Sequence, residues 1–158
     1  MIIPGYFDTS HKLQEGRSYR FNYRKKVLLS DDNEYMVFED PFGIKHLLPL
    51  ADYTHYNLVC PSVVTCLVSR INCTGRVFLE PLHPVYQIGT IHSFGITGNS
   101  FRDGQRFLCT KDIFGNPVEI PVEASMQELP PAGTDIECRI AGLKKGKPEL
   151  SLISIAAK

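Results

Sequence analysis

The sequence predicts an all-β protein made of two tandem five-stranded Greek-key barrels. One observation is an internal repeat, in which Asp40-Pro41-Phe42-Gly43 returns as Asp112-Ile113-Phe114-Gly115. Cys66 returns as Cys138 at the same offset. Short segments of alternating apolar and polar residues, separated by turn signals, are the third observation and are typical of strands with one buried face. A repeat this long that occurs twice indicates two tandem domains rather than a solenoid.

The first copy opens with an aromatic strand. Tyr19 to Tyr23 alternates aromatic and polar residues and continues into an apolar run that ends at Leu29. Because Tyr19, Phe21 and Tyr23 share one face of a strand, we expect this set to be mainly core. The turn signal at 30–33 then separates this strand from a second one at 35–39.

The remaining strands of the first copy follow from turns and β-branched residues. Proline and glycine in the segment 40–43 favour a tight turn, after which 44–48 returns as the third strand. The segment 49–61 has mixed polarity and is expected to hold one short helix or a loop. The β-branched run at 63–71 predicts the fourth strand, and 76–80 predicts the fifth.

The second copy repeats this order. Its strands are expected at 90–96, 106–110, 116–120, 136–140 and 147–153. The predicted parts of the chain are an extension at 1–15, a first barrel at 16–83 and a second barrel at 84–158. The proline-containing segment 79–86 is interpreted as a stiff linker, with a hinge at 86–89.

Five strands with the longest connection between the third and the fourth are the sequence order of an OB-fold. The turn at 40–43, the strand Ile44 to Leu48 followed by Pro49, and the run Ser62 to Val68 resemble the OB-fold RNA-binding repeats of the ribosomal protein S-one type. Both copies show the pattern, over about residues 16–155, although the first copy lacks the glycine that leads into strand four. The resemblance implies the fold and, as an expectation, RNA binding.

The alternation also predicts which side chains form the two cores. Those of the first copy are expected to be Val64, Cys66, Val68, Val77 and Leu79. Their counterparts in the second copy are Ile136, Cys138, Ile140 and Leu150.

The charges are balanced, with 17 basic and 17 acidic residues. Each half is balanced too, with nine of each sign in residues 1–88 and eight of each in 89–158. Neutrality argues against strong nonspecific duplex binding, which depends on positive charge. It leaves room for a local patch, because cations gather in 17–26 and again in 144–147. The alternative is that these are ordinary solvated charges.

The five cysteines lack the two-residue spacing of zinc sites, and their odd number fits reduced thiols rather than a disulfide framework. No segment has the roughly 18 apolar residues that a membrane span needs. We therefore expect a cytoplasmic protein without a membrane anchor, a metal or another cofactor.

No catalytic motif is evident in the sequence. It has no Gly-x-Ser-x-Gly elbow, no phosphate-binding glycine-rich loop and no His-Glu-x-x-His helix. Glu80 and His83 could form an acid–base pair, but no nucleophile accompanies them, so a structural role is the better interpretation. We expect a noncatalytic protein.

The functional hypothesis is binding of single-stranded RNA or DNA, with RNA favoured by the family resemblance. OB-folds usually bind on strands two and three and the adjoining loops, where aromatic rings stack on bases and cations meet phosphates. One copy could bind while the other serves as a scaffold. The rival hypothesis is a protein-interaction or regulatory module of a larger complex. The candidate binding residues are Arg20, Arg24, Lys25, Phe42, Lys45, His46, Arg76, Phe114 and Lys144.

Overall fold

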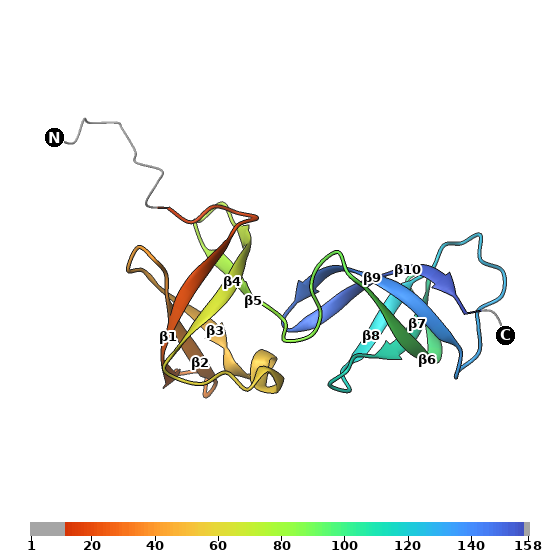
Figure 1. Cartoon of the computed structure of the whole chain (residues 1–158), viewed down its shortest axis with the longest axis horizontal. Coiled ribbons are helices and arrows are strands. Elements are labelled where there is room, and N and C mark those ends of the chain that lie inside the picture. Colours follow the sequence, from red (N-terminus) through yellow and green to blue (C-terminus); the bar gives the residue numbers. More distant parts are fainter. Residues whose placement is uncertain (1–11, 157–158) are drawn as a thin grey trace. The chain divides into compact units, whose positions relative to one another are not determined.

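The computed structural model describes residues 12–156, and its regular secondary structure is almost all β-strand (Figure 1). The chain divides into two compact units, with the boundary between Leu82 and His83. Each unit contains one five-stranded antiparallel sheet. The predicted all-β fold is confirmed.

The first unit has the strand order β3-β2-β1-β4-β5. Its central strand β1 is long enough to pair with β2 along one half and with β4 along the other. Its elements are β1 (Ser18–Leu28), β2 (Glu34–Glu39), β3 (Lys45–Pro49), the short 3-10 helix η2 (Leu50–Tyr56), β4 (Ser62–Ile71) and β5 (Val77–Pro81).

The second unit has the corresponding order β8-β7-β6-β9-β10. The edge strands β8 and β10 lie close to each other, so this sheet is nearly closed into a barrel. Closure of this kind protects strand edges that would otherwise be open. Its strands are β6 (Ile91–Arg102), β7 (Gln105–Lys111), β8 (Pro117–Pro121), β9 (Asp135–Lys144) and β10 (Lys147–Ile155).

The two units match in detail as well as in strand order. The central strand of each is interrupted by a β-bulge, between Tyr23 and Lys25 in β1 and between Ile96 and Gly98 in β6. The two bulges are separated by nearly the same offset as the repeated turns. A bulge lets a strand bend sharply, so one strand can belong to both halves of a barrel. The repeat in the sequence is therefore a repeat of strand geometry.

Each unit has a separate hydrophobic core. The first contains the aromatic face of β1, with Phe21 and Tyr23 buried and Tyr19 packed at the margin, as predicted. Of the nine predicted core residues, eight are buried, whereas Val77 is only partly buried. Val77 is the first residue of β5, next to an exposed hairpin, which explains its accessibility.

Two other predictions were wrong. The first strand of the second copy, expected at 90–96, continues beyond its bulge to Arg102. The segment 79–86 is not a linker throughout, because Leu79–Pro81 belong to β5 and are buried. His83 and Tyr86 are buried in the second unit. The prolines of this segment thus lie within or beside the folded units.

Candidate nucleic-acid interface

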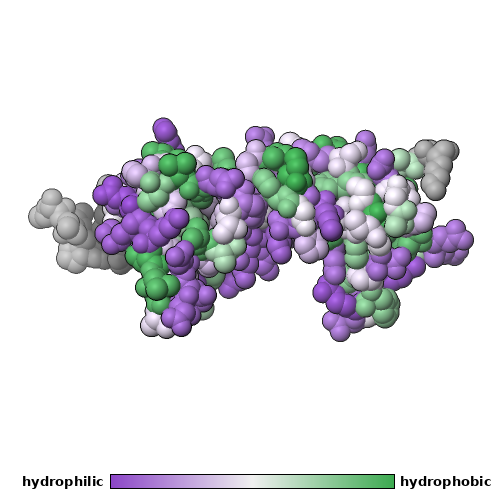
Figure 2. All heavy atoms as spheres, turned by 90° about the horizontal axis from the view of Figure 1, so that it is seen from below, coloured by the Kyte–Doolittle hydropathy of each residue, from purple (hydrophilic) through white to green (hydrophobic). Residues whose placement is uncertain are grey.

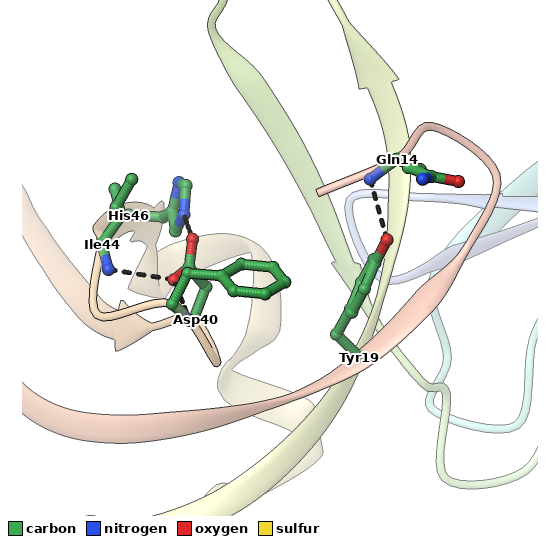
Figure 3. A network of polar contacts seen from close by, with 6 residues as sticks. Gln14, Tyr19, Asp40, Ile44 and His46 are labelled. Atoms are coloured by element: carbon green, nitrogen blue, oxygen red, sulfur yellow. Dashed lines mark hydrogen bonds and ion pairs between the residues drawn. The ribbon is translucent and has the colours of Figure 1, made fainter. Parts of the chain in front are cut away.

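A buried aspartate organises the hairpin tip in each unit. Asp40 Oδ1 accepts hydrogen bonds from the backbone N–H groups of Phe42, at 2.8 Å, and Ile44, at 2.9 Å (Figure 3). Asp112 Oδ1 accepts the equivalent bonds from Phe114 and Asn116, both at 2.9 Å. A carboxylate that satisfies two backbone donors stabilises a tight turn and fixes the direction of its tip.

His46 contacts the second oxygen of the same aspartate. Its Nε2 lies 3.0 Å from Asp40 Oδ2, and only 13% of the His46 side chain is exposed. Its ring also meets Phe21 edge-on, with centroids 6.0 Å apart. These contacts assign His46 a role in holding the turn, while its stacking on a base stays a prediction.

The tip aromatic rings are held by neighbours within their own units. Phe42 is partly buried and meets the Tyr19 ring edge-on at 6.5 Å, and the Tyr19 hydroxyl accepts a hydrogen bond from the Gln14 backbone N–H (Figure 3). Phe114 is 40% exposed and lies 5.4 Å from the His83 ring. Both rings are therefore partly accessible to solvent, and each is also packed against another ring of its own unit.

Most of the predicted cations of the first unit lie on one face. The register aligns Asn22 of β1 with Glu39 of β2 and Glu39 with Lys45 of β3. After the bulge in β1, Lys25 is paired with Val37, which lies two residues before Glu39 and therefore on the same side of β2. The core residues of these strands point to the opposite side, because successive side chains alternate. Arg20, Arg24, Lys25 and Lys45 are all exposed, and we call this outer surface of β1–β3 the basic face.

Glu39 is an acidic residue on the basic face, and it is not among the residues predicted from the sequence. Its Oε2 lies 3.4 Å from Nε of Arg24, so one of the four cations is partly neutralised. Arg24 is exposed and Glu39 is partly so, and an ion pair this accessible contributes little to stability. The alternation in β2 would have placed Glu39 on this face, had the strand register been known.

The fourth-to-fifth strand hairpin adds Arg76 at one end of this unit. Its guanidinium lies over the Phe78 ring at 4.9 Å. Close by, the Tyr35 hydroxyl donates a 2.6 Å hydrogen bond to Asp31. This bond raises the pKa of Tyr35, and the positive charge of Arg76 acts in the opposite direction. The hairpin that carries Arg76 therefore lies near the end of β2 at which Tyr35 is placed.

The corresponding face of the second unit differs in charge. Phe107 is partly buried there, beneath the guanidinium of Arg102 at 4.8 Å, and Arg102 is paired with Glu119. Lys144 lies elsewhere, in the β9–β10 hairpin opposite Lys147. The cations predicted for the two units thus form one cluster in the first unit and none on the matching face of the second.

Glu80 and His83 each have a structural role within their own unit. The Tyr53 hydroxyl donates to buried Glu80 at 3.3 Å. His83 Nδ1 accepts from the backbone N–H groups of Val85, at 3.0 Å, and Tyr86, at 2.9 Å. Glu80 and His83 thus bond to groups of the folded chain, as expected for residues with a structural role.

Within residues 12–156, no group of three His, Cys, Asp or Glu side chains is placed to hold a metal ion. No helix in the same range is long and apolar enough to cross a membrane. A scan against protein-family models finds no match to this chain, and a search of curated proteins finds no relative.

Proposed function

We propose that this chain is a noncatalytic module that binds single-stranded nucleic acid, RNA in particular, on the basic face of its first unit. The observation that carries the proposal is the alignment of Arg20, Arg24, Lys25 and Lys45 on the outer surface of β1–β3, with Glu39 as the acidic residue there. This surface is the usual ligand site of OB-folds. Local concentration of cations compensates for the overall neutrality of the chain.

The single-stranded nucleic acid would lie across β2 and β3, with its phosphates near the cations and its bases near the aromatic rings. The two rings proposed for stacking are Phe42, at the tip of the β2–β3 hairpin, and Tyr35, near the other end of β2 and close to Arg76. Stacking on such rings is tolerant of sequence, since every base has a π-face. We therefore propose weak base preference and a clear dependence of affinity on salt.

The decisive measurement is a fluorescence-anisotropy titration of labelled single-stranded RNA and DNA at two salt concentrations. For single strands, each phosphate neutralised contributes roughly 0.7 to the slope of log K against log salt. The double variant Lys25→Gln with Lys45→Gln is expected to bind more weakly and to show a flatter slope. Arg139→Gln, at an exposed position of β9, is the control that removes a cation outside the basic face.

Binding that is equally impaired by Arg139→Gln would show that only net charge matters, and would contradict a site on the first unit. If the wild-type chain binds neither RNA nor DNA at low salt, the nucleic-acid proposal fails, because phosphate attraction is strongest there.

A protein-interaction module is the second candidate function, favoured by the overall neutrality of both halves. On the surface seen in Figure 2, however, hydrophobic side chains occur in small patches among hydrophilic ones. Interfaces of stable complexes usually centre on a larger apolar area. The five cysteines all lie in the described range and are free thiols, in keeping with the proposal of a cytoplasmic location.

A further inference from the structure

The two units differ in the segment that follows the third strand. In the first unit this segment is η2, whose Tyr53 and Tyr56 are buried. The Tyr53 hydroxyl donates to Glu80 Oε1 at 3.3 Å, and Glu80 belongs to β5. One phenol ring thus fills the space between the connection after the third strand and the fifth strand.

Strand register identifies the equivalent of Glu80 in the second unit. Glu80 lies opposite Leu67 in the first unit, and Ser151 lies opposite Arg139 in the second. Leu67 and Arg139 are separated by the same offset as the two hairpin tips and the two core cysteines. A carboxylate side chain is therefore replaced by a hydroxymethyl group.

The equivalent of Tyr53 follows from the matched prolines. Pro49 ends β3 opposite Tyr35, and Pro121 ends β8 opposite Phe107, again at the offset of the repeat. Tyr53 is the fourth residue after Pro49, and Ser125 is the fourth after Pro121. In place of η2, the second unit has a turn closed by the hydrogen bond from Met126 N–H to the Glu123 carbonyl. A phenol side chain is lost at this position.

A pocket of about 580 Å³ lies where these two replacements meet. This volume is in the ordinary range for small-molecule sites. Both Ser125 and Ser151 line it, and so do parts of β10 and of the segment after β8. The lining residues are Pro121, Val122, Glu123, Ser125, Met126 and 150–155.

The chemistry of the lining indicates what would fit. Val122 and Leu150 are buried, and Met126 and Leu152 partly so, which gives apolar walls for a ring. The Ser125 hydroxyl donates to Glu123 at 3.3 Å, so an acceptor carboxylate lies at the polar side. The lining contains no lysine or arginine, which disfavours a phosphate or carboxylate ligand.

We propose that this pocket binds a phenol group, the group that Tyr53 supplies to the same place in the first unit. The ring would lie against the apolar walls and its hydroxyl would donate to Glu123 or exchange hydrogen bonds with Ser125 and Ser151. The phenol could belong to a free small molecule or to a tyrosine of a polypeptide. The proposal is independent of nucleic-acid binding, because the pocket lies in the second unit and lacks cations.

The test uses the isotope-labelled full chain, with backbone amide signals followed by NMR. Titration with p-cresol, the tyrosine side-chain analogue, is expected to shift the signals of residues 122–126 and 150–155 saturably, with a Kd on the order of 1 mM for so small a ligand. A parallel titration with N-acetyl-Gly-Tyr-Gly-amide distinguishes the sources. Tighter binding of the peptide points to a tyrosine in a polypeptide, and tighter binding of p-cresol points to a free phenol.

The matched variant is Ser125→Tyr combined with Ser151→Glu, which restores the side chains of the first unit. It should weaken p-cresol binding by at least about tenfold, because its own phenol occupies the space. Ser125→Tyr alone replaces an exposed residue and provides the same test if the double variant does not fold. The proposal is overturned if p-cresol leaves the pocket signals unchanged in the wild-type chain, or if folded variants bind it as well as the wild type.

Discussion

At the scale of single residues, the two aspartates of the hairpin tips have the clearest structural role. Asp40 and Asp112 are nearly inaccessible, at 4% and 6% exposure, and each accepts two backbone N–H bonds. A buried acid without such donors would be costly, so the turns and the acids depend on each other. The repeat in the sequence predicts these turns, but it does not indicate that the two carboxylates are buried.

Asp112→Ala is expected to destabilise the second unit by roughly 1–3 kcal/mol for each backbone donor left without an acceptor. Chemical denaturation followed by circular dichroism would measure the loss. The control is Asp135→Ala, which removes an exposed carboxylate of β9. Equal effects of the two substitutions would contradict the structural role of Asp112.

The buried cysteines give a second prediction, on pH. Burial raises the pKa of the Cys138 thiol to about 11, and burial together with the charge of Glu80 raises that of Cys66 further. A raised thiol pKa means that the folded state holds its proton more tightly than the unfolded state. The contribution to stability is therefore complete below about pH 8.5, the ordinary thiol pKa, and is lost as pH rises toward the folded value.

The burial of Cys66 and Cys138, on which this pH dependence rests, can be tested by thiol titration. A disulfide reagent is used at about pH 8, below the ordinary thiol pKa. Cys60 and Cys73 are exposed and should react at once, and partly buried Cys109 more slowly. Cys66 and Cys138 should react only after unfolding. Rapid modification of all five thiols in the native protein would show that the assigned cores are wrong.

At the scale of elements, the alternation of buried and exposed residues in β9 gives this strand one face toward the core. Ile136, Cys138 and Ile140 face the core, whereas Glu137 and Arg139 between them are exposed. The strand pairs with β6 on one side and β10 on the other, so its backbone donors are engaged on both edges.

Ile136→Ala should therefore cost roughly 2–5 kcal/mol of unfolding free energy, from lost burial and the cavity left behind. Ile153→Ala serves as the control, since Ile153 is 44% exposed on β10 and its truncation should have a much smaller effect. Thermal unfolding with an unchanged midpoint for Ile136→Ala would rule out its place in the core.

At the scale of the whole molecule, one template serves two different surfaces. Strand order, bulges and turn aspartates agree between the units, but the basic face lies on the first and the pocket of about 580 Å³ on the second. Duplicated barrels can diverge in this way because the core residues maintain the fold while outward residues change.

The proposed asymmetry predicts different effects of two matched substitutions on nucleic-acid affinity. Phe42→Ala should weaken binding of a short oligonucleotide by roughly 1–3 kcal/mol, the usual value of one stacking contact. Phe114→Ala should have the smaller effect, because the clustered lysines of its unit lie in the β9–β10 hairpin and not on the face that matches the basic face. Anisotropy titrations at one salt concentration compare the two. A greater loss from Phe114→Ala would shift the site to the second unit.

The sequence alone determined the number of units, the succession of strands along the chain and most of the core. Periodicity and repetition are local signals, since side chains alternate in any strand and Asp40 to Gly43 is a turn wherever it occurs. The first half of β6 was predicted, but its continuation to Arg102 was not, because Gly95 and Gly98 weaken the alternation around a bulge that pairing with β7 and β9 holds in place.

Only the tertiary structure decided which exposed residues lie together. Arg20 and Lys45 are distant in the sequence, and their common face depends on the register of three strands. The replacement of Tyr53 and Glu80 by Ser125 and Ser151 was present in the sequence, but the two positions become neighbours only when the third-strand connection meets the fifth strand. Sites built from distant segments depend on packing and register, which no local pattern specifies.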